Sequence, residues 1–368
     1  MSGLNYSILR GADKIGGNII EISSQNTKIL VEFGRELDNE SGELTGMEQD
    51  ILKRHYDACL ITHYHGDHAA NIGKLTCPVW MGQRCKKVMQ VQADHKQCVL
   101  PPHIETYQDG KPFVIGGIMV TPFLCDHSAL DSYMLLFECG GKKILYTGDW
   151  RTNGRKSENA GFDRLLKKLP KVDVLITENT NAHRKCVQLT EAELVDKAAE
   201  IMANCVTADK KPAPVFVLCA TTNFDRIVSF IKAANKRKRK FWMDKYQAEL
   251  CKAASDKIPV NTEIRGGGTL PTLFFVRQSK STRNLIKKIA QKHGGMMIYS
   301  MWEGYKKKDD MRNFLDEVKS WGVDIVSLHT SGHAETVQVD RLIKHVSKSD
   351  GTATDVQIVH CEQKLSLL

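Results

Sequence analysis

The stretch at residues 62–68, THYHGDH, places three histidines and an aspartate within six consecutive positions. So many titratable side chains are hard to bury together, because each imidazole or carboxylate needs a partner inside a protein. The apolar run 58–61 before the stretch is typical of the end of a buried strand, and 69–73 is typical of a short helix that ends in glycine. We therefore expect the stretch to form a strand-to-helix loop, where α/β folds place ligands.

The spacing within this loop indicates a metal site. In an extended segment His63 and His65 point to the same side, because strand side chains alternate with period two. Asp67 and His68 then turn onto the start of the helix and can face a second position. Two divalent ions a few ångströms apart suit this arrangement better than one. The alternative is a solvated loop that happens to be polar.

Composition is that of an ordinary globular protein, with 42% hydrophobic and 26% charged residues among 368. This length suits one large α/β unit or two domains. We expect no membrane span, because the chain has no apolar run of about 18 residues. The first residues lack a secretory pattern, and the 11 cysteines are scattered without a CxxC pair. We therefore expect a cytoplasmic protein with reduced thiols.

Positive charge is concentrated in one segment. Residues 182–326 hold 27 Lys and Arg against 16 Asp and Glu, an excess of 11, whereas the whole chain carries +9. The segment includes the basic runs 236–240 and 306–308. Such a block fits a polyanionic partner such as nucleic acid, although solvated lysines on helix faces explain any single run as well.

The pattern of elements changes along the chain. The first part is rich in strand signals, with a hairpin predicted over 16–22 and 27–32. Further strands are predicted over 79–81, 113–115, 119–124, 133–138 and 143–147. From Thr190, whose TEAE sequence indicates a capping box, helices at 190–206 and 223–235 alternate with strands at 214–218, 241–243 and 296–299. This alternation predicts a small parallel sheet with helical crossovers, before the chain returns to strand near 323–328.

Further metal ligands are expected at the ends of other strands. His127 follows FLC, Asp149 follows ILYTG, and His360 follows VQIV. A single histidine at the end of a strand is more often structural than a ligand. Several such residues together favour completion of a two-metal site.

In this order the motifs resemble those of the metallo-β-lactamase superfamily: an early acid on a strand, HxHxDH, a histidine, an aspartate and a final histidine. In this chain the corresponding residues are Glu32, His63, His65, Asp67, His68, His127, Asp149 and His360. The family usually has aspartate where this chain has Glu32. The resemblance implies an α/β fold, the αββα sandwich of that superfamily.

Four more stretches are similar to the nucleic-acid-processing members that resemble ribonuclease J and carry a β-CASP insertion. They are 175–181 (LITENTN), 220–227 (ATTNFDRI), 329–334 (HTSGHA) and 359–362 (VHCE). The resemblance implies a metallo-β-lactamase domain at 1–181 and 327–368. It implies a small inserted β-CASP-like α/β domain at 182–326, which coincides with the basic segment.

The resemblance also implies roles for individual residues. One ion would be held by His63, His65 and His127, a second by Asp67, His68 and His360, and Asp149 would bridge them. The ions are expected to be Zn²⁺, with Mn²⁺ as the alternative. The catalytic residues would be Asp67 together with His333, which protonates the leaving group, and Glu178, which orients it. Contacts with substrate phosphates are assigned to Ser331, Gly332, Thr222, Asn223 and Arg226. For the last three, an ordinary helix N-terminus is an equal alternative.

The leading functional hypothesis is a metal-dependent ribonuclease, in which the ion pair activates a water to hydroxide that cleaves a phosphodiester bond. RNA is favoured over DNA as the partner, and the oligomeric state is left open. One alternative is a metallo-hydrolase for a small thioester or phosphodiester. Another is a non-catalytic nucleic-acid-binding subunit, which retention of all seven ligands disfavours.

Overall fold

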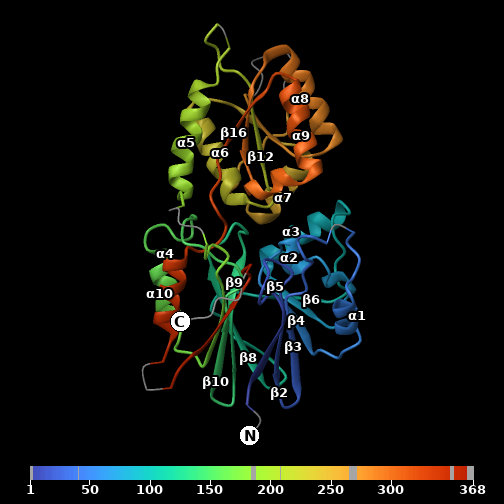
Figure 1. Cartoon of the computed structure of the whole chain (residues 1–368), viewed down its shortest axis with the longest axis vertical. Helices are drawn as coiled ribbons and strands as arrows, with labels where there is room; N and C mark the ends of the chain where they lie inside the picture. The colour runs from blue at the N-terminus through green and yellow to red at the C-terminus, as the bar shows by residue number, and fades with distance from the viewer. Residues whose placement is uncertain are drawn as a thin grey trace. The chain divides into compact units, whose positions relative to one another are not determined.

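The computed structural model describes residues 3–39, 41–183, 188–207, 209–264, 272–348 and 352–362. The chain forms two compact units, shown in Figure 1. Unit 1 comprises Met1–Val187 and Gly332–Leu368, and unit 2 comprises Gln188–Ser331. Among the described residues, no helix combines the length and apolar character that crossing a membrane requires.

The first sheet of unit 1 has six strands in chain order. They are β1 (Asn5–Arg10), β2 (Ile19–Ser24), β3 (Thr27–Val31), β4 (Ala58–Ile61), β5 (Val79–Gly82) and β6 (Ile104–Tyr107). The β1, β2 and β3 strands pair antiparallel, and the pairings from β3 to β6 are parallel. The predicted hairpin is confirmed, because β2 and β3 pair directly with Ile22 opposite Ile29.

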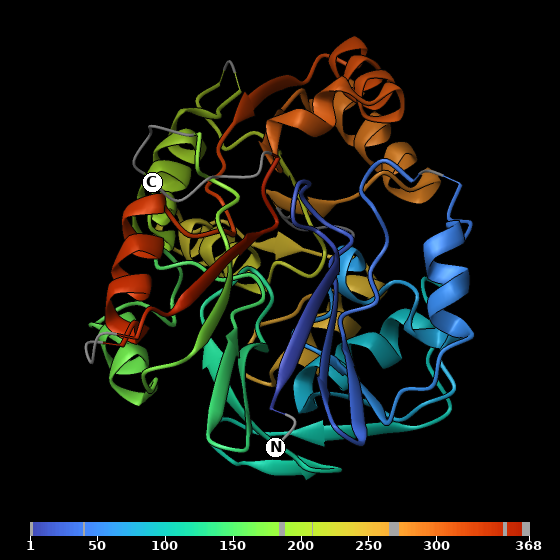
Figure 2. The same ribbon diagram turned by 60° about the horizontal axis from the view of Figure 1, so that its bottom comes forward.

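The second sheet of unit 1 also has six strands, in the order β17-β11-β10-β9-β8-β7. They are β7 (Phe113–Ile115), β8 (Ile118–Cys125), β9 (Ser132–Cys139), β10 (Lys142–Tyr146), β11 (Val174–Glu178) and β17 (Asp355–Val359). The β17 strand, red in Figure 2, pairs in parallel with the green β11 strand. This pairing brings the residues that follow β17 to the edge of the sheet where β10 and β11 end.

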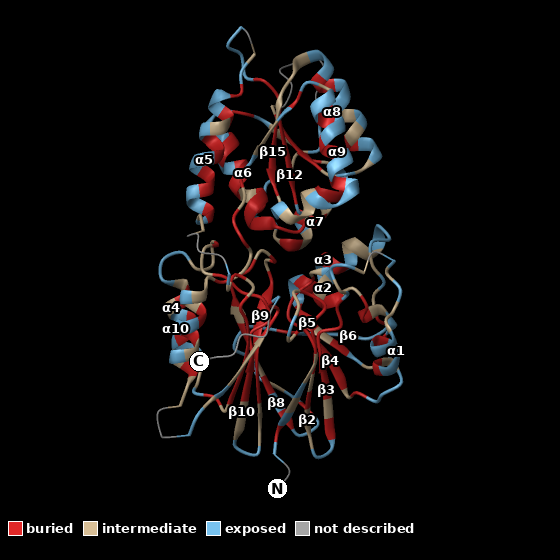
Figure 3. Cartoon of the chain, viewed as in Figure 1, coloured by how far each residue is buried: buried red, intermediate tan, exposed pale blue. Residues whose placement is uncertain are grey.

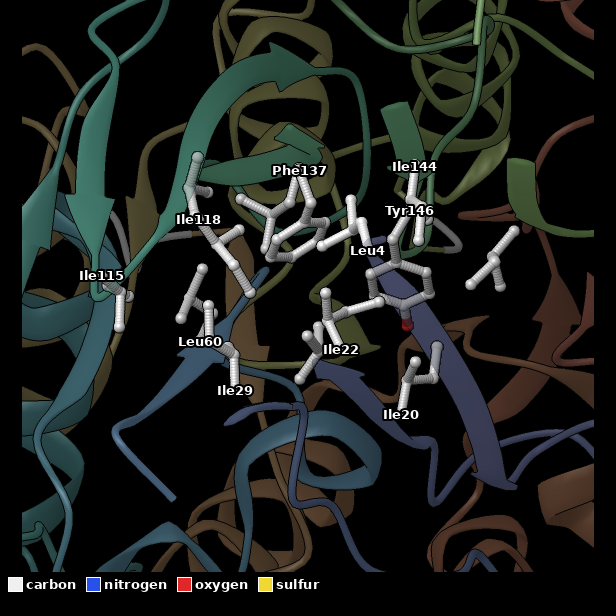
Figure 4. Close-up of a cluster of buried hydrophobic side chains, with 14 of the residues drawn as sticks. Leu4, Ile20, Ile22, Ile29, Leu60, Ile115, Ile118, Phe137, Ile144 and Tyr146 are labelled. Carbon is white, nitrogen blue, oxygen red and sulfur yellow. The ribbon is translucent and has the colours of Figure 1, made fainter. Parts of the chain in front are cut away.

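Alternating side chains of the second sheet form two cores. Ile144 contributes to a cluster with Ile20 and Leu60 of the first sheet, so the two sheets pack face to face (Figure 4). The next residue, Leu145, points to the other face, where it packs with Phe162 of α4 (Gly161–Lys168) and residues of α10 (Thr336–Val346). Burying each large aliphatic side chain contributes about 1.5–3 kcal/mol, which fixes the relative position of the strands.

Helices α1 (Gly46–Leu52), α2 (Gly66–Ala69) and α3 (Gln83–Asp94) connect the strands of the first sheet (Figure 1). The expectation that Asp67 and His68 turn onto the start of a helix is confirmed, but the bounds predicted for that helix, 69–73, were wrong. The first helical turn, α2, lies within the histidine stretch, and a separate 3₁₀ turn follows at Ile72–Lys74. The early start places Asp67 and His68 on α2 itself.

Unit 2 contains a five-stranded sheet in the order β13-β14-β12-β15-β16, with all pairings parallel. Its strands are β12 (Val215–Cys219), β13 (Phe241–Trp242), β14 (Leu273–Val276), β15 (Met296–Ser300) and β16 (Asp324–Ser327). Its helices are α5 (Glu191–Asn204), α6 (Phe224–Lys236), α7 (Lys245–Ala254), α8 (Lys280–His293), α9 (Asp309–Ser320) and the 3₁₀ helix Glu303–Lys307.

The prediction of a parallel sheet with helical crossovers is confirmed in unit 2. The β12 strand is buried along its whole length, as expected for a central parallel strand (Figure 3). The capping box is confirmed as well, since Thr190 accepts from the Glu193 N–H and the Glu193 carboxylate accepts from Thr190. The β14 strand, whose sequence is LFFV, was not among the predicted strands.

Candidate metal centre

The seven predicted ligands all lie in unit 1, after strands or on the helical turn α2. His63 and His65 follow β4, and Asp67 and His68 lie on α2. The other three are His127, Asp149 and His360, which follow β8, β10 and β17. Since β8, β10 and β17 run in the same direction, their carboxyl ends lie at one edge of the second sheet. The structure brings all seven side chains together there.

His63, His65 and His127, which we call the histidine set, offer three ring nitrogens within 4.8 Å of one another. The Nδ1 atom of His65 lies 3.1 Å from Nε2 of His63 and 3.1 Å from Nε2 of His127. Donors at Zn–N distances of 2.0–2.1 Å in a tetrahedral site are about 3.3 Å apart. The spacing of these nitrogens therefore fits one Zn²⁺-sized ion.

Asp67, His68, Asp149 and His360, which we call the mixed set, offer two carboxylates and two imidazoles within the same limit of 4.8 Å. Nε2 of His360 lies 3.3 Å from Oδ2 of Asp67, and Nε2 of His68 lies 3.2 Å from Oδ2 of Asp149. The same Asp149 oxygen is 4.0 Å from Nε2 of His127. Asp149, a member of the mixed set, therefore also lies next to the histidine set.

The histidine set is electrostatically suited to act as a neutral ligand group. Burial lowers the pKa values of His63 and His127 well below the ordinary value, with the neighbouring imidazoles contributing. Burial also lowers the pKa of His65 to about 4. The three rings are thus uncharged near neutral pH, and only an uncharged imidazole nitrogen can bind a metal.

The mixed set contains buried polar atoms that a cation would satisfy. Among the described residues, Oδ1 of Asp149 has no hydrogen-bond partner, and the ring nitrogens of His68 lie 3.3 Å from Glu32 and 3.2 Å from Oδ2 of Asp149 without the geometry of a hydrogen bond. Burial lowers the pKa of His68, but the charges of Asp149, Asp67 and Glu32 outweigh it and raise the pKa well above the ordinary value. The same negative charges would attract a divalent cation, whose binding to His68 would release that proton. Buried polar atoms without hydrogen bonds are rare in proteins. The donor set and its unsatisfied atoms therefore fit a divalent ion.

Groups behind the ligands orient their rings. Glu32, fully buried with φ of 62°, accepts from the Thr62 hydroxyl and lies 3.3 Å from Nδ1 of His68. The Thr62 hydroxyl is also 3.0 Å from Nδ1 of His63. Such contacts fix which ring nitrogen faces a metal. Thr62 was not identified from the sequence, although its place between the strand and His63 was a usable signal.

His127 and His360 are oriented in the same way. Nδ1 of His127 lies 2.6 Å from the Gly332 carbonyl, and Nδ1 of His360 lies 2.8 Å from the Thr180 hydroxyl. Thr180 donates to Glu178 at 2.5 Å. Sequence reasoning missed Thr180, because only the β11–β17 pairing brings it beside His360.

Glu178 and His333 form a pair next to the two sets. Nδ1 of His333 is 2.9 Å from Oε2 of Glu178, whose other oxygen accepts from the Trp150 N–H at 2.8 Å. Glu178 is 1% exposed, whereas the His333 side chain is 22% exposed. Burial lowers the pKa of His333, but the charges of Glu178 and Asp149 prevail and raise it to about 9. His333 is thus a partly exposed histidine that holds a proton at neutral pH.

The five predicted phosphate contacts are placed in different surroundings. Gly332 lies in unit 1, and a Cβ there would stand 3.0 Å from the Ser128 hydroxyl. Ser331 belongs to unit 2, where its N–H donates to the side chain of Gln188. Asn223 is the N-cap of α6 and its side chain accepts from the Arg226 N–H, so it performs the ordinary capping role considered above. Thr222, just before it, is 9% exposed.

Arg226 is fully buried inside unit 2. Its guanidinium pairs with Glu191 at 3.1 Å and donates to the Ser300 hydroxyl at 2.6 Å and the Thr330 carbonyl at 3.0 Å. A contact with a substrate phosphate, as predicted from the sequence, would require these interactions to break. In this structure Arg226 joins α6 to α5, β15 and the segment after β16.

Similarity to known proteins was found by sequence and by structure, although no family model matches the chain. The chain is 24% identical over 205 residues to endoribonuclease ysh-1 of Neurospora crassa, covering 48% of this chain and 23% of the relative. It is 21% identical over 297 residues to the human DNA cross-link repair 1A protein, covering 78% and 27%. It is 22% identical over 191 residues to ribonuclease J of Sinorhizobium meliloti, covering 50% and 32%.

These matches span about a quarter to a third of the relatives' length. The similarity to a protein named ribonuclease J confirms the resemblance drawn from the motifs. A solved structure of a protein of unknown function from Enterococcus faecalis V583 superposes with a TM-score of 0.78 at 18% identity. That match covers 100% of this chain and 96% of the other, so the whole chain shares that fold.

Proposed function

We propose that this chain, a relative of nucleases of the metallo-β-lactamase superfamily, is a metal-dependent nuclease that cleaves phosphodiester bonds, with RNA as its substrate. The observation that carries the proposal is the convergence of the histidine set and the mixed set around Asp149. In this proposal unit 1 is the αββα metallo-β-lactamase domain and unit 2 is the inserted β-CASP-like domain.

The histidine set would hold one ion and Asp67, His68 and His360 a second, with Asp149 between them. Zn²⁺ suits the nitrogen-rich histidine set, and Mn²⁺ is the alternative at the more oxygen-rich mixed set. Such ions supply a water of lowered pKa and polarise a phosphoryl oxygen. Thr62, Glu32 and the Gly332 carbonyl orient the ligand rings, which keeps the donor atoms in place.

His333 would give a proton to the leaving oxygen. Glu178 holds the ring through Nδ1, 2.9 Å from the carboxylate, and Trp150 in turn holds Glu178. Histidine is the side chain that most often acts as a general acid, and a carboxylate that fixes its orientation keeps the proton-donating nitrogen in place. Of the five residues predicted to contact substrate phosphates, Gly332 is the one that lies in unit 1 with His333.

Nucleic acid is favoured as the substrate by the charge of unit 2. The α8 helix carries no acidic residue in its 14 positions. All four of its lysines are exposed and, at 100° per residue, share one side of the helix. They are Lys280, Lys287, Lys288 and Lys292. A thioester or another small molecule needs no such surface, whereas a phosphodiester chain is attracted to it.

The test is incubation of Zn²⁺- or Mn²⁺-loaded protein with end-labelled single-stranded RNA, single-stranded DNA and a thioester. We expect the parent protein to cleave RNA. This cleavage should be lost in Asp149→Ala and strongly reduced in His333→Ala. DNA cleavage without RNA cleavage would correct the substrate, an outcome that the similarity to a DNA cross-link repair protein makes worth measuring. Thioester hydrolysis alone, with both polynucleotides intact, would refute the proposal.

Binding is tested separately with Asp149→Ala. Replacing Lys287 and Lys288 by glutamine should lower the slope of log affinity against log salt by about 0.7 for each phosphate of a single strand that the lysines neutralise. Gln291→Ala, on the same helix but uncharged, is the control that should leave the slope unchanged.

A further inference from the structure

A buried ion pair lies behind the mixed set in unit 1. Arg10, the last residue of β1, is 7% exposed, and Glu48 of α1 is 0% exposed. Nη2 of Arg10 lies 2.9 Å from Oε1 of Glu48. A buried ion pair costs desolvation and is weak evidence for stability by itself. What this pair does is therefore better judged from the other groups that it contacts.

The arginine joins three segments that are apart in the sequence. Its Nε donates to the Gly17 carbonyl at 2.5 Å, and its Nη2 donates to the Gly34 carbonyl at 2.7 Å. Oε1 of Glu48 also accepts from the Asn71 side chain at 3.0 Å, which donates in addition to Gly34 at 3.2 Å. Arg10, Glu48 and Asn71 thus form one network around the Gly34 carbonyl.

Gly34 is packed directly on the peptide that joins Asp67 to His68. A Cβ at Gly34 would stand 1.8 Å from the Asp67 carbonyl oxygen and 2.4 Å from the His68 nitrogen. Two backbone hydrogen bonds flank this contact, from Phe33 N–H to His68 O at 2.9 Å and from Arg35 N–H to Gly66 O at 3.0 Å. The position of Gly34 therefore sets the position of two ligands of the mixed set.

The third ligand of the mixed set depends on the residue next to Arg10. The His360 N–H donates to the Gly11 carbonyl at 2.7 Å, and His360 has a left-handed φ of 54°. Such a conformation is uncommon for a residue other than glycine and needs support from its surroundings. Gly11 provides this support, and Arg10 fixes the chain immediately before Gly11.

The histidine set is held by other groups. His63 contacts the Thr62 hydroxyl at 3.0 Å, and His127 contacts the Gly332 carbonyl at 2.6 Å. Thr62 directly follows β4, Gly332 precedes α10, and neither lies on the segments that Arg10 joins. Glu32, which accepts from Thr62, is itself anchored to β4, since its N–H donates to the Leu60 carbonyl at 2.9 Å. Loss of the Arg10–Glu48 network should therefore affect one set and spare the other.

We propose that Arg10 and Glu48 are positioning residues for the mixed set: their network around the Gly34 carbonyl holds Asp67, His68 and His360 in the geometry that binds an ion. This inference rests on the proposed function in one respect, that the two sets bind divalent ions. Partners one layer behind a ligand typically change metal affinity by about 10- to 100-fold. Arg10 acts through backbone, so we expect the low end, about tenfold.

The experiment measures Zn²⁺ affinity by competition with a chromophoric chelator, with each set isolated. His63→Ala leaves the mixed set intact, and His360→Ala leaves the histidine set intact. Adding Arg10→Met to His63→Ala should weaken binding about tenfold. Adding it to His360→Ala should leave affinity unchanged within about twofold. Arg10→Lys, which keeps the charge but cannot reach the same three acceptors, should weaken the mixed set in the same way.

A double variant separates positioning from stability. Arg10→Met with Glu48→Met removes both charges, which restores much of the stability that a single change loses. The mixed set should nevertheless stay about tenfold weaker, because the Gly34 and Gly17 carbonyls are no longer held. Arg239→Met is the matched control, since Arg239 of unit 2 is a buried arginine that also donates to carbonyls, those of Ala213, Met202 and Cys205. It should leave both affinities unchanged.

Affinity that recovers together with the thermal midpoint in the double variant would overturn the inference, as would equal weakening of both sets. Unchanged affinity of the mixed set in Arg10→Met would overturn it too, while leaving the proposed function intact. Failure of the parent chain to bind any divalent ion is a different result and would overturn the proposed function itself.

Discussion

Glu191→Ala should leave the Arg226 guanidinium buried in unit 2 without its acid partner. Both side chains of this ion pair are 0% exposed, and the charged groups are 3.1 Å apart. Glu191 also accepts from the Ser229 hydroxyl at 2.6 Å, so the substitution removes two interactions from one buried position. The structure therefore predicts a large loss of stability from a single change at the first residue of α5.

The magnitude follows from the burial. Removing one partner of a buried ion pair typically costs about 3–5 kcal/mol, because the remaining charge is uncompensated. With a urea m value of about 2–3 kcal/mol/M, the midpoint of unfolding should fall by about 1.5 M. Glu191→Leu with Arg226→Leu removes both charges and should cost less than Glu191→Ala alone. Its remaining cost is the loss of the hydrogen bonds that Arg226 gives to the Ser300 hydroxyl and the Thr330 carbonyl, about 1 kcal/mol each.

The assay is urea unfolding followed by circular dichroism, with hydrogen exchange of the β12 and β15 amides to assign the transition to unit 2. A loss below about 1 kcal/mol in Glu191→Ala would refute the reasoning from burial. The same series tests the phosphate contact predicted for Arg226 from the sequence. If Arg226→Leu raised the KM for RNA with no change in stability, Arg226 would be a substrate contact and the account from its burial would be wrong.

Three further predictions concern unit 1. Gly148→Ala should lower the free energy of unfolding by about 1–2 kcal/mol, because φ is 54° and a Cβ would stand 2.8 Å from the Thr62 hydroxyl. An unchanged midpoint of thermal unfolding would show that alanine is not strained at this position. Thr180→Val should lower the affinity for the metal bound through His360 by about 10-fold or more, as measured by titration calorimetry. An unchanged affinity would show that the Thr180 hydroxyl does not orient the His360 ring. Chelation should lower the melting temperature of the Zn²⁺-loaded chain by about 10 °C, because saturating metal stabilises the folded state by about 4 kcal/mol. An equal drop in Asp149→Ala would argue that the metal does not bind at this site.

Much of the local structure was predictable because its signals are local. The β2–β3 hairpin follows from two strand patterns separated by a turn, and the start of α5 follows from the Thr190 capping box. The sequence predicted that Asp67 and His68 stand at the start of a helix, but it did not predict the bounds of that helix, which lies packed against Gly34, far away in the sequence. The bounds 182 and 326, which we assigned to an inserted β-CASP-like domain, remain predictions.

The sequence by itself determined which side chains could form the site and that each would stand near the end of a strand. It did so because strand periodicity, turn residues and clustered ligands are properties of neighbouring residues. Only the tertiary structure decided that His360 meets Asp67, through the β11–β17 pairing, and that Arg226 is buried in an ion pair. Strand pairing and burial depend on which distant apolar faces exclude water together, and no short stretch of sequence records that choice.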